Sequence, residues 1–326
     1  MSGILITKKI NSMKKFALGI DIGGTNSAFG LVDDLGEIHF EESIPTRSMS
    51  TPEDMVNEIY NRINQKTSFV NNIVGIGIGA PNGNYFHGTI DNAPNLLWKG
   101  IIPFAELFEK KFGVKAVLTN DANAAAVGEQ LFGNAKDLKN FVTITLGTGL
   151  GSGVIIDNVL IYGHNSLAGE YGHIRVIPNG RDCGCGRKGC LETYASATGV
   201  VRSIQLLESH YKSTSGILHI ENPKAENVFE LAEKGDAFCI EIIDYTARIL
   251  GNALAEFACF SNPKAYVLFG GIAQSGEGFA KKVKDIMEEG ILNIYQDQIE
   301  IRISSLHDRN AAVLGAASLI RKELAQ

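Results

Sequence analysis

Residues 16–33 read FALGIDIGGTNSAFGLVD, an apolar run, a glycine-rich turn and a second apolar run that ends at Asp33. Residues 141–157 repeat this pattern as FVTITLGTGLGSGVIID, and aligning residue 20 with residue 144, a shift of 124, superimposes IDIGGT on ITLGTG. Short apolar runs around a glycine turn are typical of β-hairpins. The repeat therefore predicts two hairpins that open two similar halves of the chain, with strands over 16–20, 28–32, 141–146 and 154–156.

Each predicted hairpin is followed by further apolar runs of strand length, over 73–78 and 115–119 in the first half and over 266–269 and 299–304 in the second. Helical patterns separate these runs. The alternation of strands and helices predicts an α/β fold in which helices cover the sheets.

Local signals mark the ends of several predicted helices. Thr51 before Pro52 is a favoured helix start, Gly113 ends the pattern 103–112, and the long pattern 236–260 stops before Pro263. We expect an N-terminal extension over 1–15, a small α/β domain over 16–120 and a large α/β domain over 121–308. The last helix, 309–326, is expected to pack back on the small domain.

Composition narrows the functional class. The chain has 326 residues, 44% of them hydrophobic, and a net charge of −6. A negative chain without a basic block does not attract nucleic acid or an anionic membrane surface. No apolar run approaches the length of a membrane span, and the first fifteen residues are too short and too polar for a signal peptide. We expect a cytoplasmic protein with no nucleic-acid or membrane partner.

Three of the five cysteines follow a histidine in the pattern His173-x9-Cys183-x-Cys185-x4-Cys190. Thiolates and imidazole are the ligands that tetrahedral zinc prefers, and four of them close a structural site. A disulfide is disfavoured because the CxC pair is too close for an unstrained bridge, and one cysteine would be left over. Cys239 and Cys259 fall in apolar helical patterns and are expected in the core.

The glycine turns can bind phosphate, because backbone N–H groups approach an anion closely where no side chain intervenes. Thr25 and Thr148 add hydroxyl donors, and Gly270-Gly271 follow another buried strand. Asp21, at the end of the first strand, could orient Mg²⁺ beside such phosphates. The alternative is that the glycines only serve hairpin geometry.

Asn120-Asp121 lies between a predicted strand and the helical run ANAAAVGEQLF. Aspartate is a favoured N-cap, so Asp121 could simply begin the helix. A carboxylate at this position could also accept the proton of an attacking hydroxyl in phosphoryl transfer. The two interpretations are compatible.

From Phe16 to the C-terminus the chain resembles the ROK family of sugar kinases, and within it the zinc-containing bacterial glucokinases. The motifs that carry the resemblance are GIDIGGTN, GIGAPNG, NLLW, NDANAAA, TLGTGLGSG, AGEYGHI, CGCGRKGCLE and LFGG. The resemblance implies an actin-like ATPase fold of the ribonuclease H-like class, with two α/β domains flanking a deep cleft. ATP and a hexose would meet in that cleft.

The resemblance also implies roles for individual residues. Asp121 would be the catalytic base. The hexose would contact Asn82, Asn95, Asn120, Asp121, Glu170, His173 and Glu192. The nucleotide and Mg²⁺ would contact Asp21, Gly23, Gly24, Thr25, Gly147, Thr148, Gly149, Gly270 and Gly271. Structural Zn²⁺ would bind His173, Cys183, Cys185 and Cys190. Trp98 is expected to be a core or interdomain anchor more than a sugar-stacking residue.

The expected reaction is transfer of the ATP γ-phosphoryl group to the 6-hydroxyl of glucose. N-acetylglucosamine, N-acetylmannosamine or another hexose stays open as the substrate, because selectivity depends on pocket shape. A catalytically silent sugar-binding regulator is the alternative of a different class. We also expect a homo-oligomer, either a dimer or a tetramer.

Overall fold

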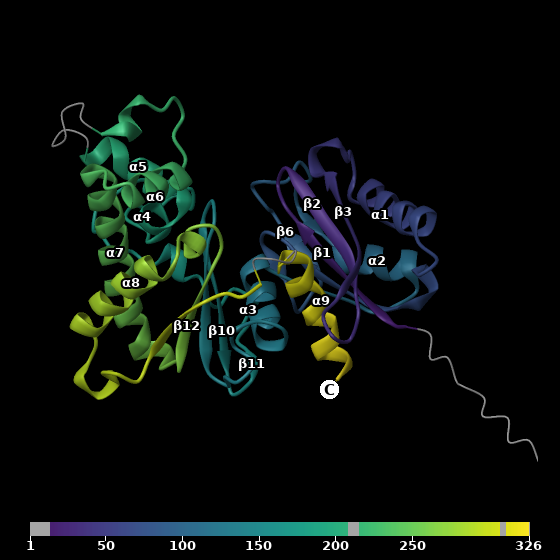
Figure 1. Cartoon of the computed structure of the whole chain (residues 1–326). Helices are drawn as coiled ribbons and strands as arrows, with labels where there is room; N and C mark the ends of the chain where they lie inside the picture. Colours follow the sequence, from purple (N-terminus) through teal and green to yellow (C-terminus); the bar gives the residue numbers. More distant parts are fainter. Residues whose placement is uncertain (1–13, 208–214, 307–310, 326) are drawn as a thin grey trace, which may run out of the picture.

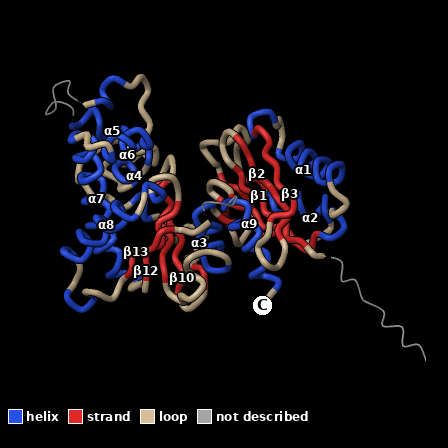
Figure 2. The backbone as a smooth tube through the Cα atoms, viewed as in Figure 1, coloured by secondary structure: helices blue, strands red, loops and turns tan. Residues whose placement is uncertain are grey.

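The computed structural model describes residues 14–207, 215–306 and 311–325. Two lobes are each built around a β-sheet (Figure 2). Each of these sheets has five strands. The first sheet has the order β3-β2-β1-β4-β8. Its strands are β1 (Phe16–Ile22), β2 (Asn26–Val32), β3 (Ile38–Pro45), β4 (Ile73–Gly79) and β8 (Ala116–Thr119).

The second sheet has the order β11-β10-β9-β12-β13. Its strands are β9 (Phe141–Leu146), β10 (Leu150–Ile156), β11 (Val159–Leu160), β12 (Ala265–Phe269) and β13 (Glu300–Ile303). β1 pairs antiparallel with β2, and β9 pairs antiparallel with β10, which confirms the two predicted hairpins. A small third sheet contains β5 (Gly83–Asn84), β6 (Thr89–Asp91) and β7 (Ile101–Ile102).

Helices cover both sheets, which confirms the predicted α/β class (Figure 1). Beside the first sheet lie α1 (Pro52–Lys66) and α2 (Phe104–Phe112). The second lobe contains α4 (Glu192–Ala195), α5 (Ala197–Leu207), α6 (Ala225–Glu233), α7 (Ala237–Ser261) and α8 (Glu277–Gly290). Two further helices, α3 (Asp121–Leu131) and α9 (Ala311–Leu324), lie between the two lobes.

The helix signals in the sequence correspond to observed caps. The Thr51 side chain accepts a hydrogen bond from the Asp54 N–H, and the Asp54 carboxylate accepts one from the Thr51 N–H, forming a capping box. Gly113 ends α2 in the left-handed conformation with φ 70°. The Asp236 side chain caps α7. Cys239 is buried in α7 as expected, but the expectation for Cys259 was wrong, since it lies on an exposed side of that helix.

The alternation of β1 explains how its two faces are used. Phe16, Leu18 and Ile20 point into a core shared with α1 and α2, because side chains two residues apart lie on one face of a strand. On the opposite face, a Cβ on Gly19 would lie 2.0 Å from the Val313 carbonyl oxygen. Only glycine lets the α9 backbone approach this strand so closely, and Asp21 is on the same face of β1.

The strand β10 begins at Leu150, four residues before the predicted start at residue 154. The glycines that suggested a longer turn are in fact inside the strand. A Cβ on Gly153 would lie 2.5 Å from the Ala126 Cβ, and one on Gly151 would lie 2.8 Å from the Ala122 Cβ. These glycines therefore permit the close packing of α3 on β10.

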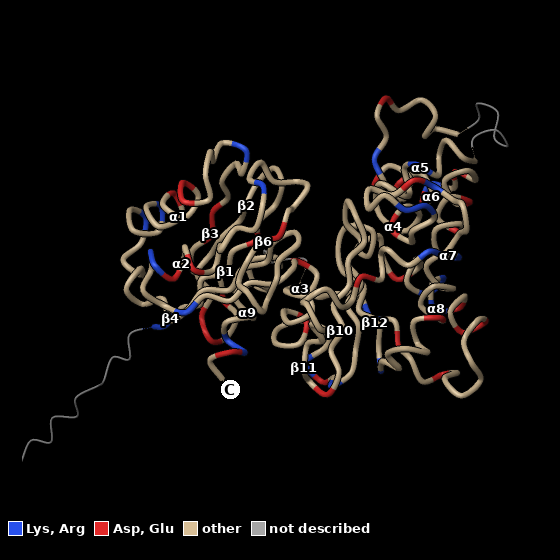
Figure 3. The backbone as a smooth tube through the Cα atoms, turned by 180° about the vertical axis from the view of Figure 1, so that it is seen from behind, with Lys and Arg blue, Asp and Glu red and all other residues tan. Residues whose placement is uncertain are grey.

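Basic and acidic residues are interspersed over both lobes (Figure 3). Within the described ranges, no helix combines the length and the apolar character needed to span a bilayer.

Candidate active site

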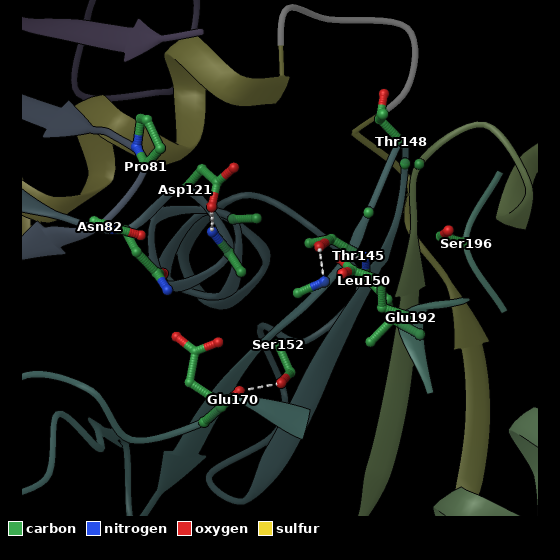
Figure 4. A pocket seen from close by; sticks show the side chains of 18 of the residues that line it. Pro81, Asn82, Asp121, Thr145, Thr148, Leu150, Ser152, Glu170, Glu192 and Ser196 are labelled. Carbon is green, nitrogen blue, oxygen red and sulfur yellow. Dashed lines mark hydrogen bonds between the residues drawn. The ribbon is translucent and has the colours of Figure 1, made fainter. Parts of the chain in front are cut away.

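A cavity of about 760 Å³ lies between the lobes. Its walls include the end of β1, the loop after β4, the start of α3 and the β9–β10 turn. In the view of Figure 4, Asn82, Asp121 and Glu170 lie on one side, and Thr148 and Ser196 lie on the other. Polar groups from both halves of the chain thus meet in one space.

Most residues predicted to contact the hexose or the nucleotide line this cavity, and five do not. Those that line it are Asp21, Asn82, Asn95, Asn120, Asp121, Gly147, Thr148, Gly149, Glu170, Glu192 and Gly270. Those outside its lining are Gly23, Gly24, Thr25, His173 and Gly271, of which Gly271 lines a second cavity.

The first glycine turn is tied to neighbouring chain segments. The Thr46 N–H donates to the Thr25 carbonyl at 2.8 Å, and the Thr46 hydroxyl donates to the Gly23 carbonyl at 2.7 Å. A Cβ on Gly24 would lie 2.9 Å from the Asn95 carbonyl oxygen. Packing alone therefore requires glycine at position 24, and this turn lies beside the cavity rather than in its wall.

The second glycine turn lies in the cavity wall. A Cβ on Gly147 would have no atom within 4 Å, so it would project into open space. The start of α5 anchors the turn, because the Ala197 N–H donates to the Gly147 carbonyl and the Thr198 hydroxyl to the Thr148 carbonyl, each at 2.8 Å. Gly147 is therefore free of packing constraints, and the space beside it can admit an anion.

A second cavity of about 460 Å³ adjoins the other side of this turn. Gly147, Thr148 and Gly271 line it together with Phe229 and Ile272 and with three glutamates, Glu226, Glu230 and Glu233. Phe229 and Ile272 offer an apolar surface that suits a flat aromatic ring. The turn thus has a cavity on each side.

Two aspartates in the lining of the first cavity lie close to Gly79. A Cβ on Gly79 would lie 3.6 Å from the Asp121 Cα and 3.7 Å from an Asp21 carboxylate oxygen. Burial, with a further contribution from the charge of Asp121, raises the pKa of Asp21 to about 7. Although the cavity admits solvent to Asp121, the surrounding protein displaces most water, and this desolvation raises the pKa of Asp121 as well.

The helix cap at the start of α3 is Asn120. Its side chain accepts a hydrogen bond from the Asn123 N–H at 2.7 Å. Asp121 is the first helical residue, and its carboxylate accepts from the Ala122 N–H at 2.8 Å. The N-cap interpretation of Asp121 was therefore wrong, because the preceding residue already fills that role.

The loop after β4 supplies Asn82, which has φ 53° and donates from its side chain to the Asp91 carbonyl at 3.1 Å. Asparagine tolerates this left-handed conformation better than most residues.

Trp98 is 7% exposed in the core of the first lobe, and its indole N–H donates to the Met49 carbonyl at 3.0 Å. This confirms Trp98 as a core residue.

Two glutamates from the cysteine-rich segment also reach the cavity. Glu170 precedes a 3-10 turn over Tyr171–His173, and burial raises its pKa. One Glu192 carboxylate oxygen accepts from the Leu150 N–H at 3.3 Å, and the other lies 3.9 Å from His173 Nδ1. Glu192 therefore connects the second hairpin to the cysteine cluster.

The four predicted zinc ligands converge. One ligand atom from each of His173, Cys183, Cys185 and Cys190 lies within 4.8 Å of the others. His173 Nδ1 is 3.6 Å from Cys183 Sγ, and Cys185 Sγ is 3.6 Å from Cys190 Sγ. Tetrahedral zinc with Zn–S bonds of about 2.3 Å requires sulfur atoms about 3.7 Å apart. The donor set and its spacing fit a closed zinc site.

The cavity has lining residues that the sequence reasoning missed, among them Thr145, Ser152, Ser166 and Arg202. Thr145 could have been found, because the shift of 124 places it opposite Asp21 in the repeat. Ser152 lies within the TLGTGLGSG motif but was given no role, whereas Ser166 and Arg202 belong to no motif and reach the cavity only through the fold.

Comparison with known proteins agrees with this architecture. A model of the ROK family matches residues 17–323. A glucokinase of Halalkalibacterium halodurans is 33% identical over 95% of this chain and 96% of its own length, and one of Streptomyces coelicolor is 34% identical over 94% and 97%.

A crystal structure of a ROK family glucokinase from Streptomyces griseus, in complex with glucose and AMPPNP, superposes with a TM-score of 0.80. It is 31% identical in sequence and covers 94% of this chain and 99% of that chain. The fold is thus that of the ROK sugar kinases, an actin-like ATPase fold with two α/β lobes, as the motifs implied. The chain belongs to the ROK family.

Proposed function

We propose that this chain is an ATP-dependent hexokinase that phosphorylates the 6-hydroxyl of glucose. One observation carries the proposal: the Asp121 carboxylate and the open glycine turn at Gly147 line the same cavity. A base and a phosphate-binding turn in one cavity are what phosphoryl transfer to a hydroxyl requires. The similarity to proteins named glucokinase supports glucose as the acceptor.

The hexose would lie among side chains that both donate and accept hydrogen bonds. Asn82 and Asn95 belong to the first lobe, Asn120 caps α3, and Glu170 and Glu192 come from the second lobe. Carboxylates accept from sugar hydroxyls, and asparagine amides can also donate to them. His173 would complete this wall from behind, with Nδ1 on the metal and Nε2 toward the sugar.

Asp121 would act as the general base. The 6-oxygen attacks the γ-phosphorus while its proton passes to the Asp121 carboxylate. The bond from that phosphorus to the bridging β–γ oxygen breaks, and ADP leaves. Desolvation raises the pKa of Asp121, which makes its carboxylate a better proton acceptor than a fully hydrated one.

The ATP phosphates would lie along Gly147, Thr148 and Gly149, near the first turn of Gly23, Gly24 and Thr25, while Gly270 and Gly271 would border the adenosine. The second cavity, in which Phe229 and Ile272 offer an apolar surface, supports this direction for the adenine base. Mg²⁺, when bound, neutralises charge on the phosphates. Asp21 fits such an ion, because it is a hard oxygen donor whose buried charge has no cation in the described structure to offset it.

Zinc would hold the segment that carries Glu170, His173 and Glu192. A closed four-ligand site leaves no position for a reacting water, so the metal would be structural. Its effect on catalysis would pass through the sugar-binding glutamates.

An ADP-release assay with glucose, mannose, fructose, N-acetylglucosamine and N-acetylmannosamine tests the proposal. The expected result is the highest kcat/KM with glucose. A higher value with an N-acetylated sugar would reassign the substrate. Sugar binding without ADP release from any member of the panel would support the silent regulator instead.

A further inference from the structure

Two tyrosines from different lobes stack on each other. Tyr85 follows β5 in the first lobe, and Tyr162 follows β11 in the second. Their ring centroids are 3.9 Å apart, and the ring planes are inclined by only 7°. Phe86 packs its edge against Tyr162, with centroids 6.0 Å apart. Aromatic stacking therefore joins two loops that are distant in sequence.

A hydrogen bond joins the same two loops. The Tyr85 N–H donates to the Ser166 hydroxyl at 2.8 Å. Ser166 is 3% exposed, has φ 68° and lines the cavity between the lobes. We call the contacts of Tyr85 with Tyr162 and Ser166 the aromatic bridge. Because it has two attachment points, the bridge limits both sliding and rotation of one loop against the other.

Each loop also carries a predicted sugar-binding residue. Asn82 precedes Tyr85 by three residues, and Glu170 follows Ser166 by four. Both side chains reach the cavity (Figure 4). The first and second lobes thus contribute one wall each to the proposed sugar pocket, and the bridge reaches the cavity at Ser166.

We propose that Tyr85, Tyr162 and Ser166 are positioning residues that set the separation of the two sugar-binding walls. The inference rests on the proposed function, because it requires that a hexose bind between Asn82 and Glu170. Hydrogen bonds to a sugar depend steeply on distance. A bridge that holds both loops in place lowers the cost of ordering them when the sugar binds.

The C-terminal helix fixes the Tyr85 ring from the other side. The Tyr85 hydroxyl donates to the Glu323 carboxylate, and Lys115 Nζ lies 2.9 Å from the same carboxylate. Burial and this hydrogen bond to Glu323 raise the pKa of Tyr85 to about 12, so the phenol stays protonated and able to donate at neutral pH. Glu323 therefore orients the ring for stacking.

Calorimetric titration with glucose in the absence of ATP tests the proposal on Tyr162→Ala, Ser166→Ala and Tyr162→Phe. Loss of an aromatic stack predicts a rise of about two- to tenfold in the glucose Kd of Tyr162→Ala. Ser166→Ala removes only one hydroxyl, so it keeps the proposal testable if Tyr162→Ala fails to fold. The glucose Kd of Ser166→Ala should rise as well. Tyr162→Phe keeps the ring and should restore the affinity.

A control variant and a second measurement distinguish a positioning role from general destabilisation. Tyr60 on α1 makes an edge-on pair with Phe112, with centroids 5.1 Å apart, and does not line the cavity. Tyr60→Ala should lower Tm yet leave the glucose Kd unchanged. In the bridge variants the KM for ATP should stay within about twofold of wild type, because Ala197 and Thr198 of α5, and not the bridge residues, donate the hydrogen bonds that anchor the glycine turn at Gly147.

Each outcome decides the proposal. The positioning role of the bridge is overturned if the glucose Kd is unchanged in both alanine variants, or if the Kd for glucose and the KM for ATP rise equally. Neither result affects the proposed function as long as the wild-type protein phosphorylates glucose. Wild-type protein that binds glucose without phosphorylating it overturns the function but leaves the bridge to be judged on Kd. Wild-type protein that binds no sugar of the hexose panel overturns both.

Discussion

The carboxylate of Asp21 lies close enough to that of Asp121 for the charge of Asp121 to add to burial in raising the pKa of Asp21 to about 7. The two residues belong to different elements, since Asp21 is the last but one residue of β1 and Asp121 is the first residue of α3. Their proximity brings two carboxylates to the lining of one cavity. A cation held by Asp21 would relieve the repulsion between the two carboxylates. Asp121, beside that cation, would be placed to accept a proton.

The raised pKa of Asp21 predicts a pH-dependent cost to stability. Between about pH 4 and pH 7 the unfolded chain ionises this carboxyl while the folded protein keeps it protonated, so wild type loses stability as pH rises through this window and levels off above it. A shift from 3.8 to about 7 is worth at most about 4 kcal/mol, and less here because the cavity admits water. Asp21→Asn should remove the contribution of Asp21 to this pH dependence.

Urea denaturation of wild type and Asp21→Asn at pH 5 and pH 8, without divalent cations, checks this. The variant should gain stability relative to wild type at pH 8. If the stability of wild type instead increased relative to that of the variant as pH rises, the raised pKa of Asp21 would be contradicted.

Asp121→Asn should lower turnover by about 10²- to 10⁴-fold with glucose binding largely retained, because only the proton acceptor is lost. Steady-state ADP release and calorimetric glucose titration provide the two measurements. Asp285→Asn, at an exposed ion pair with Lys281, is the matched control and should behave as wild type. Near-normal turnover in Asp121→Asn would remove it from the role of base.

Cys185→Ser should lose bound zinc and weaken glucose binding together, by about 10- to 100-fold, because the metal holds the segment between Glu170 and Glu192. Metal analysis and glucose titration on the same preparation measure both. Cys259→Ser, at an exposed cysteine outside the cluster, should change neither. If zinc is lost while glucose affinity stays normal, the metal does not organise the sugar pocket.

Gly147→Ala should raise the KM for ATP without lowering Tm. The added Cβ meets no protein atom within 4 Å and instead occupies the space proposed for phosphate. Gly77→Ala tests the opposite case of a glycine in close packing, because its Cβ would lie 1.8 Å from the Ala316 carbonyl oxygen in α9. That variant should be destabilised by about 1–3 kcal/mol or more. Equal effects of both changes on Tm would refute the distinction.

Local signals were sufficient for most secondary structure. The capping box at Thr51, the glycine cap at Gly113 and the repeated hairpin pattern all depend on residues within a few positions of each other. The early start of β10 was missed because Gly151 and Gly153 look like turn residues until α3 is packed against them. The small sheet β5–β7 was missed because two- and three-residue strands leave no periodicity to read.

The site residues also fall into those that local sequence signals predicted and those that depend on the fold. Spacing and ligand chemistry alone brought together His173 and the three cysteines, and the structure places them within range of one metal. The resemblance supplied the individual roles of the aspartates, asparagines and glutamates. Neither could distinguish the two glycine turns, which look equivalent in the repeat but differ in whether they line the cavity.

The sequence by itself determined the hairpins, the helix caps and the four-ligand set, since each depends on backbone preference or donor chemistry over a short span. Only the tertiary structure decided that Gly147 is open while Gly24 is packed against Asn95, and that Tyr85 meets Tyr162 across the lobes. The physical reason is that these contacts join residues distant along the chain. Their geometry is set by how closely α3 and α9 pack against the two sheets, which no local pattern encodes.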